Sequence, residues 1–112
     1  MNLDRPLKLF GTPKQTQILV LLGFLEESYP RELSRLTGVS LTAVQSYLES
    51  MELVGVLASR LIGKERRVSL NPRFYAYREL QALLQKLAEA DKSIQLKAAT
   101  LRRRPRRKGK EI

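Results

Sequence analysis

The sequence contains no cysteine and no histidine. Without cysteine the chain can form neither a disulfide framework nor a reactive thiolate, which fits a reducing cytoplasm. Histidine and cysteine supply most catalytic proton transfer and most zinc ligation, so we expect neither an enzyme nor a metal or cofactor site. No glycine-rich phosphate loop occurs either. Paired carboxylates occur only on helix faces, where Glu49, Glu52, Glu79 and Glu89 are most simply solvated charges.

Long apolar runs are also missing. The longest, residues 18–25, is far too short to span a bilayer, and Glu26 and Glu27 follow it instead of the small residues of a cleavage site. We therefore expect a cytoplasmic protein, associated with the nucleoid, that has no membrane partner. A chain of 112 residues holds one domain with a modest core, and such a core often gains stability from a second subunit.

Basic residues are abundant and unevenly distributed. The formal net charge is +10, and residues 102–112 contribute +6 of it, with seven basic residues and one acidic residue. Pro105 and like-charge repulsion predict a disordered tail in this segment. The tail is either an arm for an A·T-rich minor groove or a non-specific phosphate anchor. Its candidate DNA contacts are Arg102, Arg103, Arg104, Arg106 and Arg107.

Residues 30–53 have the pattern of two helices joined by a sharp turn. Pro30 suits the first position of a helix, and Gly38 can take the left-handed conformation that ends it. Ser40 can then cap a second helix that begins at Leu41 and runs to Leu53. This spacing predicts a helix-turn-helix unit.

The second of these helices has one apolar and one polar face. Val44, Leu48 and Met51 repeat at four- and three-residue steps and should face inward. The opposite face is polar, and Gln45 could bond an adenine through both its amide atoms, as expected of a helix in the major groove. No cation occurs between Leu41 and Leu53, although arginine bound to guanine is the commonest specific contact. The candidate contacts are Ser40, Leu41, Thr42, Gln45 and Ser46.

A basic β-hairpin is expected immediately after this helix. Residues 56–62 are rich in β-branched and aliphatic side chains, residues 63–65 form a turn, and residues 66–70 return as a second strand. Four cations should cluster around the tip of the hairpin, where they can reach phosphates or the minor groove. These are Arg60, Lys64, Arg66 and Arg67.

Two further helices should frame this unit. A capping box at Thr12 and Gln15 starts one over residues 13–27, which is apolar nearly all round. A long last helix should run from Pro72 or Arg73 to about residue 101. Its leucine stripe is longer than a small core can cover, so we expect a coiled-coil-like homodimer contact; the alternative is a helix folded back on its own domain and frayed beyond Asp91. The expected dimer contacts are Leu21, Leu25, Leu80, Leu84, Leu87 and Ile94.

The motifs at residues 30–40, 43–51, 54–57 and 66–72 together resemble the winged helix-turn-helix transcriptional regulators of the ArsR-like type, over residues 8–90. The resemblance implies a mainly α-helical fold with a small β-hairpin wing and a long C-terminal helix. It also implies operator binding as a homodimer, with Gln45 and Ser46 facing the bases and Tyr47 standing where the family often has histidine. The family's metal sensing does not carry over, because the chain lacks both residue types that would bind the metal.

The resulting domain organisation is a DNA-binding domain over residues 1–74, a dimerisation helix over 75–101 and the tail over 102–112. The function expected is sequence-specific binding of double-stranded DNA by a transcriptional regulator, most simply a repressor. Two alternatives are open: a weakly specific architectural protein of the nucleoid, and a winged-helix module that binds another protein. The sequence identifies no effector.

Overall fold

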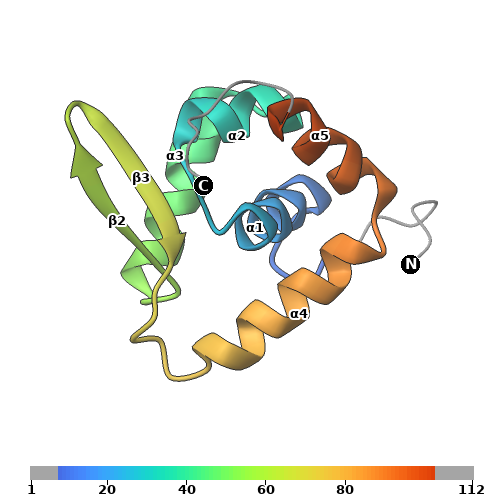
Figure 1. Ribbon diagram of the computed structural model, residues 1–112. Helices are drawn as coiled ribbons and strands as arrows, with labels where there is room; N and C mark the ends of the chain where they lie inside the picture. The colour runs from blue at the N-terminus through green and yellow to red at the C-terminus, as the bar shows by residue number, and fades with distance from the viewer. Residues whose placement is uncertain (1–7, 103–112) are drawn as a thin grey trace.

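The computed structural model describes residues 8–102 as a mainly helical fold with a small antiparallel sheet. Figure 1 shows α1 in the centre, the sheet on one side, and the two last helices around the other side. The elements in order are α1 (Pro13–Leu25), β1 (Glu27–Ser28), α2 (Pro30–Thr37), α3 (Leu41–Leu53), β2 (Leu57–Ile62), β3 (Glu65–Leu70), α4 (Tyr77–Glu89) and α5 (Lys92–Arg102).

The central helix α1 begins at the expected capping box. The Thr12 hydroxyl accepts a hydrogen bond from the Gln15 N–H at 3.1 Å, and the Gln15 side chain accepts one from the Thr12 N–H at 2.9 Å. Gly23 lets α4 approach closely, because a Cβ added there would lie 2.7 Å from the side chain of Leu84. The apolar residues of α1 therefore form the middle of the core within one chain.

Helices α2 and α3 begin and end at the residues that the sequence indicated, with a sharp turn between them. Gly38 ends α2 with a φ of 78°, and its N–H bonds to the Ser34 carbonyl at 2.9 Å. The Ser40 hydroxyl caps α3 by accepting from the Ala43 N–H at 3.2 Å. Val44 and Leu48 then point into the core, which fixes which face of α3 remains outside.

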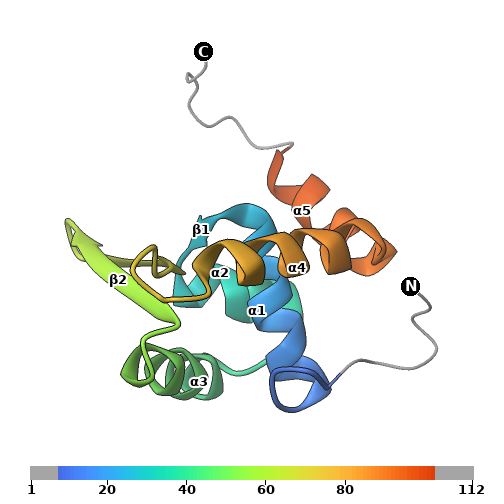
Figure 2. The ribbon, with the colours of Figure 1, turned by 90° about the horizontal axis from the view of Figure 1, so that it is seen from below.

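The hairpin also forms, and it gains a third strand that sequence patterns missed. β2 pairs with β3 from Leu57 opposite Leu70 to Ile62 opposite Glu65, and the turn uses Gly63 at a φ of 65°. β1 pairs with the other edge of β3. With two residues, β1 is too short to give a periodic signal. In Figure 2 the hairpin projects from the body beside α3.

The expected single long C-terminal helix is wrong. Residues 71–76 form turns, so α4 starts at Tyr77, and the chain breaks again at Asp91. The Asp91 carboxylate accepts hydrogen bonds from the N–H groups of Ser93 at 2.9 Å and Ile94 at 3.2 Å, which starts a new helix. The change of direction lets both α4 and α5 pack on α1.

This packing covers the stripe that was expected to form a dimer seam. Leu21, Leu84 and Ile94 are all 0% exposed within one chain. The remaining three expected contacts are partly buried against the same core, at Leu25, Leu80 and Leu87. The helical pair is folded back on its own domain, as in the alternative, but residues 92–102 are helical and not frayed. The stripe therefore gives no reason for a second subunit.

Within residues 8–102, no helix combines the length and the hydropathy that a membrane span requires.

Candidate nucleic-acid interface

The outward face of α3 has the polar character expected of a reading helix. Thr42, Gln45 and Ser46 are exposed, whereas Val44 is 0% and Leu48 2% exposed. The Ser40 side chain is on the surface, but its hydroxyl already accepts the hydrogen bond that caps α3. Short polar groups near the start of a helix are well placed to approach base edges.

Tyr47 is buried, although it directly follows two residues of α3 that face solvent, Gln45 and Ser46. Its hydroxyl donates a hydrogen bond to the Phe10 carbonyl at 2.8 Å, and the residue is only 6% exposed. Burial raises the pKa of its phenol to about 12. The side chain therefore stays neutral at physiological pH and ties α3 to the segment before α1.

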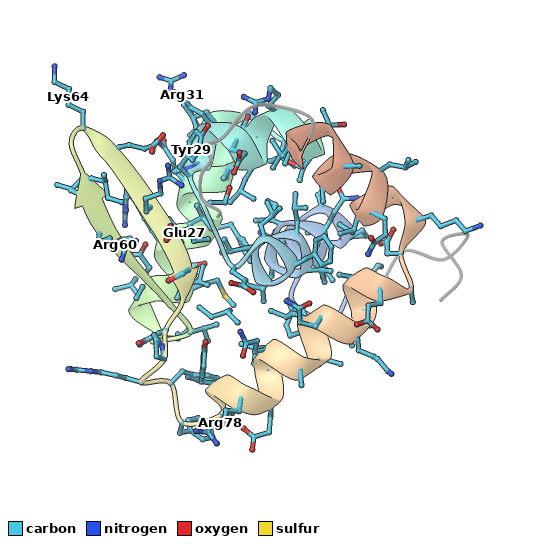
Figure 3. All side chains as sticks on the ribbon, in the orientation of Figure 1. Glu27, Tyr29, Arg31, Arg60, Lys64 and Arg78 are labelled. Atoms are coloured by element: carbon cyan, nitrogen blue, oxygen red, sulfur yellow. The ribbon has the colours of Figure 1, made fainter. Side chains whose placement is uncertain are left out.

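A concave pocket of about 550 Å³ separates α3 from the hairpin. Leu41 and Gln45 line it from α3, and Arg31 lines it from the start of α2. Lys64 closes it from the hairpin turn. Figure 3 shows Arg31 and Lys64 extending on the same side of the molecule.

Arg31 and Lys64 form no ion pair within the described residues. This distinguishes them from the arginines of the hairpin, and it leaves their charges available to an external anion. Arg31 was not among the residues singled out from the sequence. It follows Pro30 at the start of an expected helix, and only the tertiary fold places that helix start opposite the hairpin turn.

The expected cluster of four cations at the hairpin tip is not formed. Arg60 and Arg67 are cross-strand partners, so they share one face, while Arg66 points to the other because side chains alternate along a strand. Only Lys64 lies in the turn itself. Sequence proximity suggested a cluster that strand geometry divides.

Carboxylates compensate all three of these arginines. Arg60 Nη2 lies 3.0 Å from Glu27 Oε2. Arg66 Nη2 donates to both oxygens of Glu52, at 2.7 and 2.8 Å, and its Nε donates to the Ser59 hydroxyl at 3.1 Å.

Arg67 has the most partners of the three. Its Nε donates to Glu65 Oε1 at 2.9 Å, and its Nη1 lies 4.0 Å from Glu27 Oε1. Its guanidinium also sits 5.2 Å from the centre of the Tyr29 ring. To bind a phosphate, Arg67 and the other two arginines must therefore share or give up a carboxylate partner.

Of the five candidate arginines of the tail, one lies within the described residues. Arg102 ends α5 and so belongs to a helix. The other four, Arg103, Arg104, Arg106 and Arg107, lie outside the described residues. Within residues 8–102 no group of three or more acidic side chains is arranged to hold a metal ion.

Searches of protein-family models, of curated proteins and of solved structures find no match to this chain.

Proposed function

We propose that this protein binds double-stranded DNA as a winged helix, with α3 in the major groove. The observation that carries the proposal is the exposed polar face of α3, which opens onto a concave pocket rimmed by the unpaired cations Arg31 and Lys64. A groove-reading helix needs an outer face free of core packing and cations positioned for the flanking phosphates. Both are found on one side of this chain.

The proposed contacts divide into two kinds. Gln45 presents a donor and an acceptor on one planar amide, which matches adenine, while Thr42 and Ser46 can bond either kind of base edge. Arg31 and Lys64 neutralise phosphates on each side of the pocket and position the protein without reading sequence. The paired arginines of the hairpin add to this only where DNA displaces a carboxylate.

A regulatory role follows from sequence-specific binding of this kind. We propose a transcriptional regulator of the ArsR-like winged-helix type that acts on the nucleoid as a dimer, because two copies can enter major grooves about 34 Å apart. The dimer contact would not be the buried stripe of α4 and α5. Leu83 and Leu96 remain exposed on the outer surface of these helices, at 42% and 71%, and are the better candidates.

Protein binding is a second candidate function, favoured by the far end of α3. Leu53 is 88% and Val54 66% exposed there, next to the acidic Glu49. Such a surface repels phosphates and is costly to leave in water. A protein partner would cover it, whereas DNA would not.

Selection of bound sequences from a random DNA pool, with the full chain, separates these functions. We expect one enriched motif with twofold symmetry. Tight, salt-sensitive binding without enrichment would support the architectural alternative, since counterion release carries no sequence preference. Absence of DNA binding would overturn the proposal and favour a protein partner at Leu53 and Val54.

A further inference from the structure

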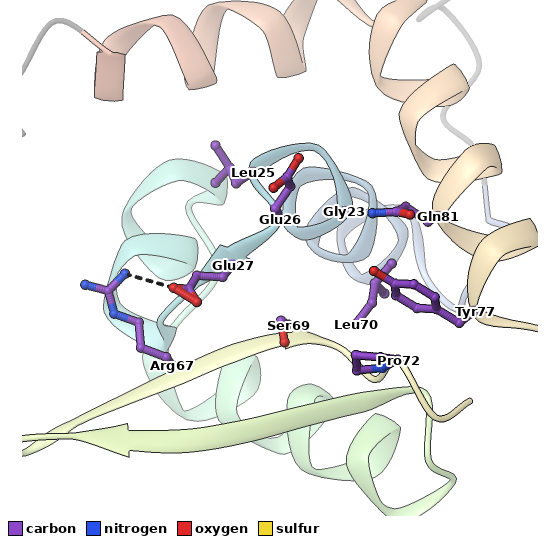
Figure 4. Close-up of a pocket in the computed structure, with 10 residues that line it drawn as sticks. All are labelled: Gly23, Leu25, Glu26, Glu27, Arg67, Ser69, Leu70, Pro72, Tyr77 and Gln81. Atoms are coloured by element: carbon purple, nitrogen blue, oxygen red, sulfur yellow. Dashed lines mark ion pairs between the residues drawn. The ribbon is translucent and has the colours of Figure 1, made fainter. Parts of the chain in front are cut away.

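A second cavity lies between α1, β3 and α4 and shares no residue with the concave pocket beside α3. Its volume is about 530 Å³, which falls within the usual range of small-molecule sites. Figure 4 shows the residues that line it, contributed by the end of α1, by β3 and by α4. The cavity is therefore a feature of the tertiary fold and not of any one loop.

The lining combines apolar surface with free hydrogen-bonding groups. Leu25, Leu70 and Pro72 supply the apolar part. Tyr77 and Gln81 contribute a hydroxyl and an amide, which Figure 4 shows directed from α4 toward α1. Within the described residues neither side chain has a hydrogen-bond partner, so both are available to a ligand.

The unmatched charge in this cavity is negative. Arg67 is already bonded to Glu65 and lies beside Glu27. Glu26, in contrast, has no ion-pair partner among residues 8–102, and it lines the cavity next to Glu27. The charge of Arg67, the one cation among the lining residues, is therefore matched by carboxylates, and Glu26 leaves an excess of negative charge that disfavours an anionic ligand.

We propose that this cavity binds a small organic cation, with an ammonium or guanidinium group at Glu27, while the exposed Glu26 at the rim, whose carboxylate is directed away from Glu27 in Figure 4, supplies the excess negative charge. The body of the ligand lies on Leu25, Leu70 and Pro72, and a polar group at its other end bonds to Tyr77 and Gln81. The lining is more polar than apolar, and its placed polar groups would give the ligand its orientation.

Occupancy of the site has a consequence for the hairpin. Glu27 bonds Arg60 at 3.0 Å and also faces Arg67, so a cation in the cavity competes with both arginines for one carboxylate. Arginines released in this way can bind phosphate, and the ligand then strengthens DNA binding. This coupling rests on the DNA-binding function proposed above, whereas the cation site does not.

Three probes with nearly the same shape test the site without DNA. Tyramine carries an ammonium, tyrosol a neutral hydroxyl and para-hydroxyphenylacetate a carboxylate on the same phenolic skeleton. Calorimetric titration of the full chain should show tyramine binding at least about tenfold tighter than tyrosol, because its bonds to carboxylates are charge-assisted. The anion should bind most weakly. Equal affinity for the three, tighter binding of the anion, or no binding of tyramine overturns the proposal.

Matched variants locate the binding. Glu26→Gln should remove most of the preference for tyramine over tyrosol, and Gln81→Leu should weaken both probes. Glu89→Gln removes an exposed carboxylate at the end of α4 and should change neither. If Glu26→Gln behaves like Glu89→Gln, the cation does not bind in this cavity.

DNA affinity measured with and without tyramine tests the coupling separately. Saturating tyramine should tighten DNA binding several-fold, and tyrosol should not. Binding of tyramine with unchanged DNA affinity overturns the coupling but not the site. Binding of tyramine by a protein that binds no DNA overturns the proposed function and leaves the cation site standing.

Discussion

Arg66 of β3 donates two hydrogen bonds to the carboxylate of Glu52 in the last turn of α3, at 2.7 and 2.8 Å. The pair ties α3, the proposed reading helix, to the hairpin across from it, and Arg66 also lines the concave pocket between the two. The pair also sequesters a cation that the sequence offered as a DNA contact. Arg66 is 38% and Glu52 22% exposed at the side chain, so the pair is only partly protected from solvent.

Glu52→Gln is expected to lower the stability of the protein and to raise its affinity for DNA. Loss of the ion pair should lower the free energy of unfolding by about 0.5–1 kcal/mol. The released Arg66 should bind a phosphate and steepen the dependence of log K on log salt by about 1. Denaturant unfolding and fluorescence anisotropy over a salt series measure the two effects. Glu49→Gln removes the same charge from α3 but breaks no ion pair in residues 8–102, and identical results for the two variants would contradict the role of Arg66.

Gln45→Ala tests specific reading by α3. Gln45 is exposed and does not contribute to the core, so thermal stability should be unchanged. Affinity for the selected DNA site should fall by about 1–3 kcal/mol, with little change for random DNA. Competition binding with both DNAs measures the difference. An equal loss on both would make Gln45 a contact that carries no sequence information.

Arg31→Ala and Lys64→Ala test the phosphate contacts. Each should weaken binding to all sequences and reduce the magnitude of the salt slope by about 1, because one phosphate contact is lost. Arg78→Ala is the matched control, since Arg78 is exposed on α4 at the opposite end of the molecule from Lys64 (Figure 3). A slope that changes as much for Arg78 as for Arg31 would place the DNA on another surface.

The raised pKa of Tyr47 predicts that the protein loses stability at high pH. Burial raises the pKa of Tyr47 in the folded protein from its ordinary 10.0 to about 12. The stability that the neutral phenol contributes is therefore complete below pH 10 and is lost as the pH rises through 12. Over that window stability should fall with a slope of at most about 1.4 kcal/mol per pH unit for this one proton. Unfolding free energies at several pH values measure the slope. Tyr47→Phe should flatten it, at a cost of about 1 kcal/mol at neutral pH for the lost hydrogen bond to Phe10. An unchanged slope would assign the titration to other groups.

Ile94→Glu distinguishes a folded-back helix from a dimer seam. Ile94 is 0% exposed within one chain, so a carboxylate there should lower the stability of the single chain by several kcal/mol. Unfolding curves at two protein concentrations and analytical ultracentrifugation measure stability and association. If the variant instead dissociates from dimer to monomer and the monomer stays folded, Ile94 belongs to a dimer contact after all. Leu96→Glu, at an exposed position of the same helix, should leave the fold unaffected.

Local signals in the sequence determined helices α2 and α3, the turn between them and the hairpin. The proline at position 30, the left-handed Gly38 and the cap at Ser40 act within a few residues, and each takes the position predicted for it. The buried positions Val44 and Leu48 followed from helical periodicity. Such features are readable because their free energies depend on neighbours in the chain and hardly on the rest of the fold.

Tertiary structure alone decided the partners of these elements. Asp91 ends α4 and caps α5, and the break lets both helices pack on α1, which a straight helix could not cover. The apolar periodicity of the sequence continues through the break and therefore does not reveal it. The carboxylates on Arg60 and Arg66 come from residues 33 and 14 positions away, a separation at which sequence patterns carry no pairing information. The cavity between α1, β3 and α4 likewise exists only once three distant segments meet, because its polar groups belong to elements that nothing in the sequence links.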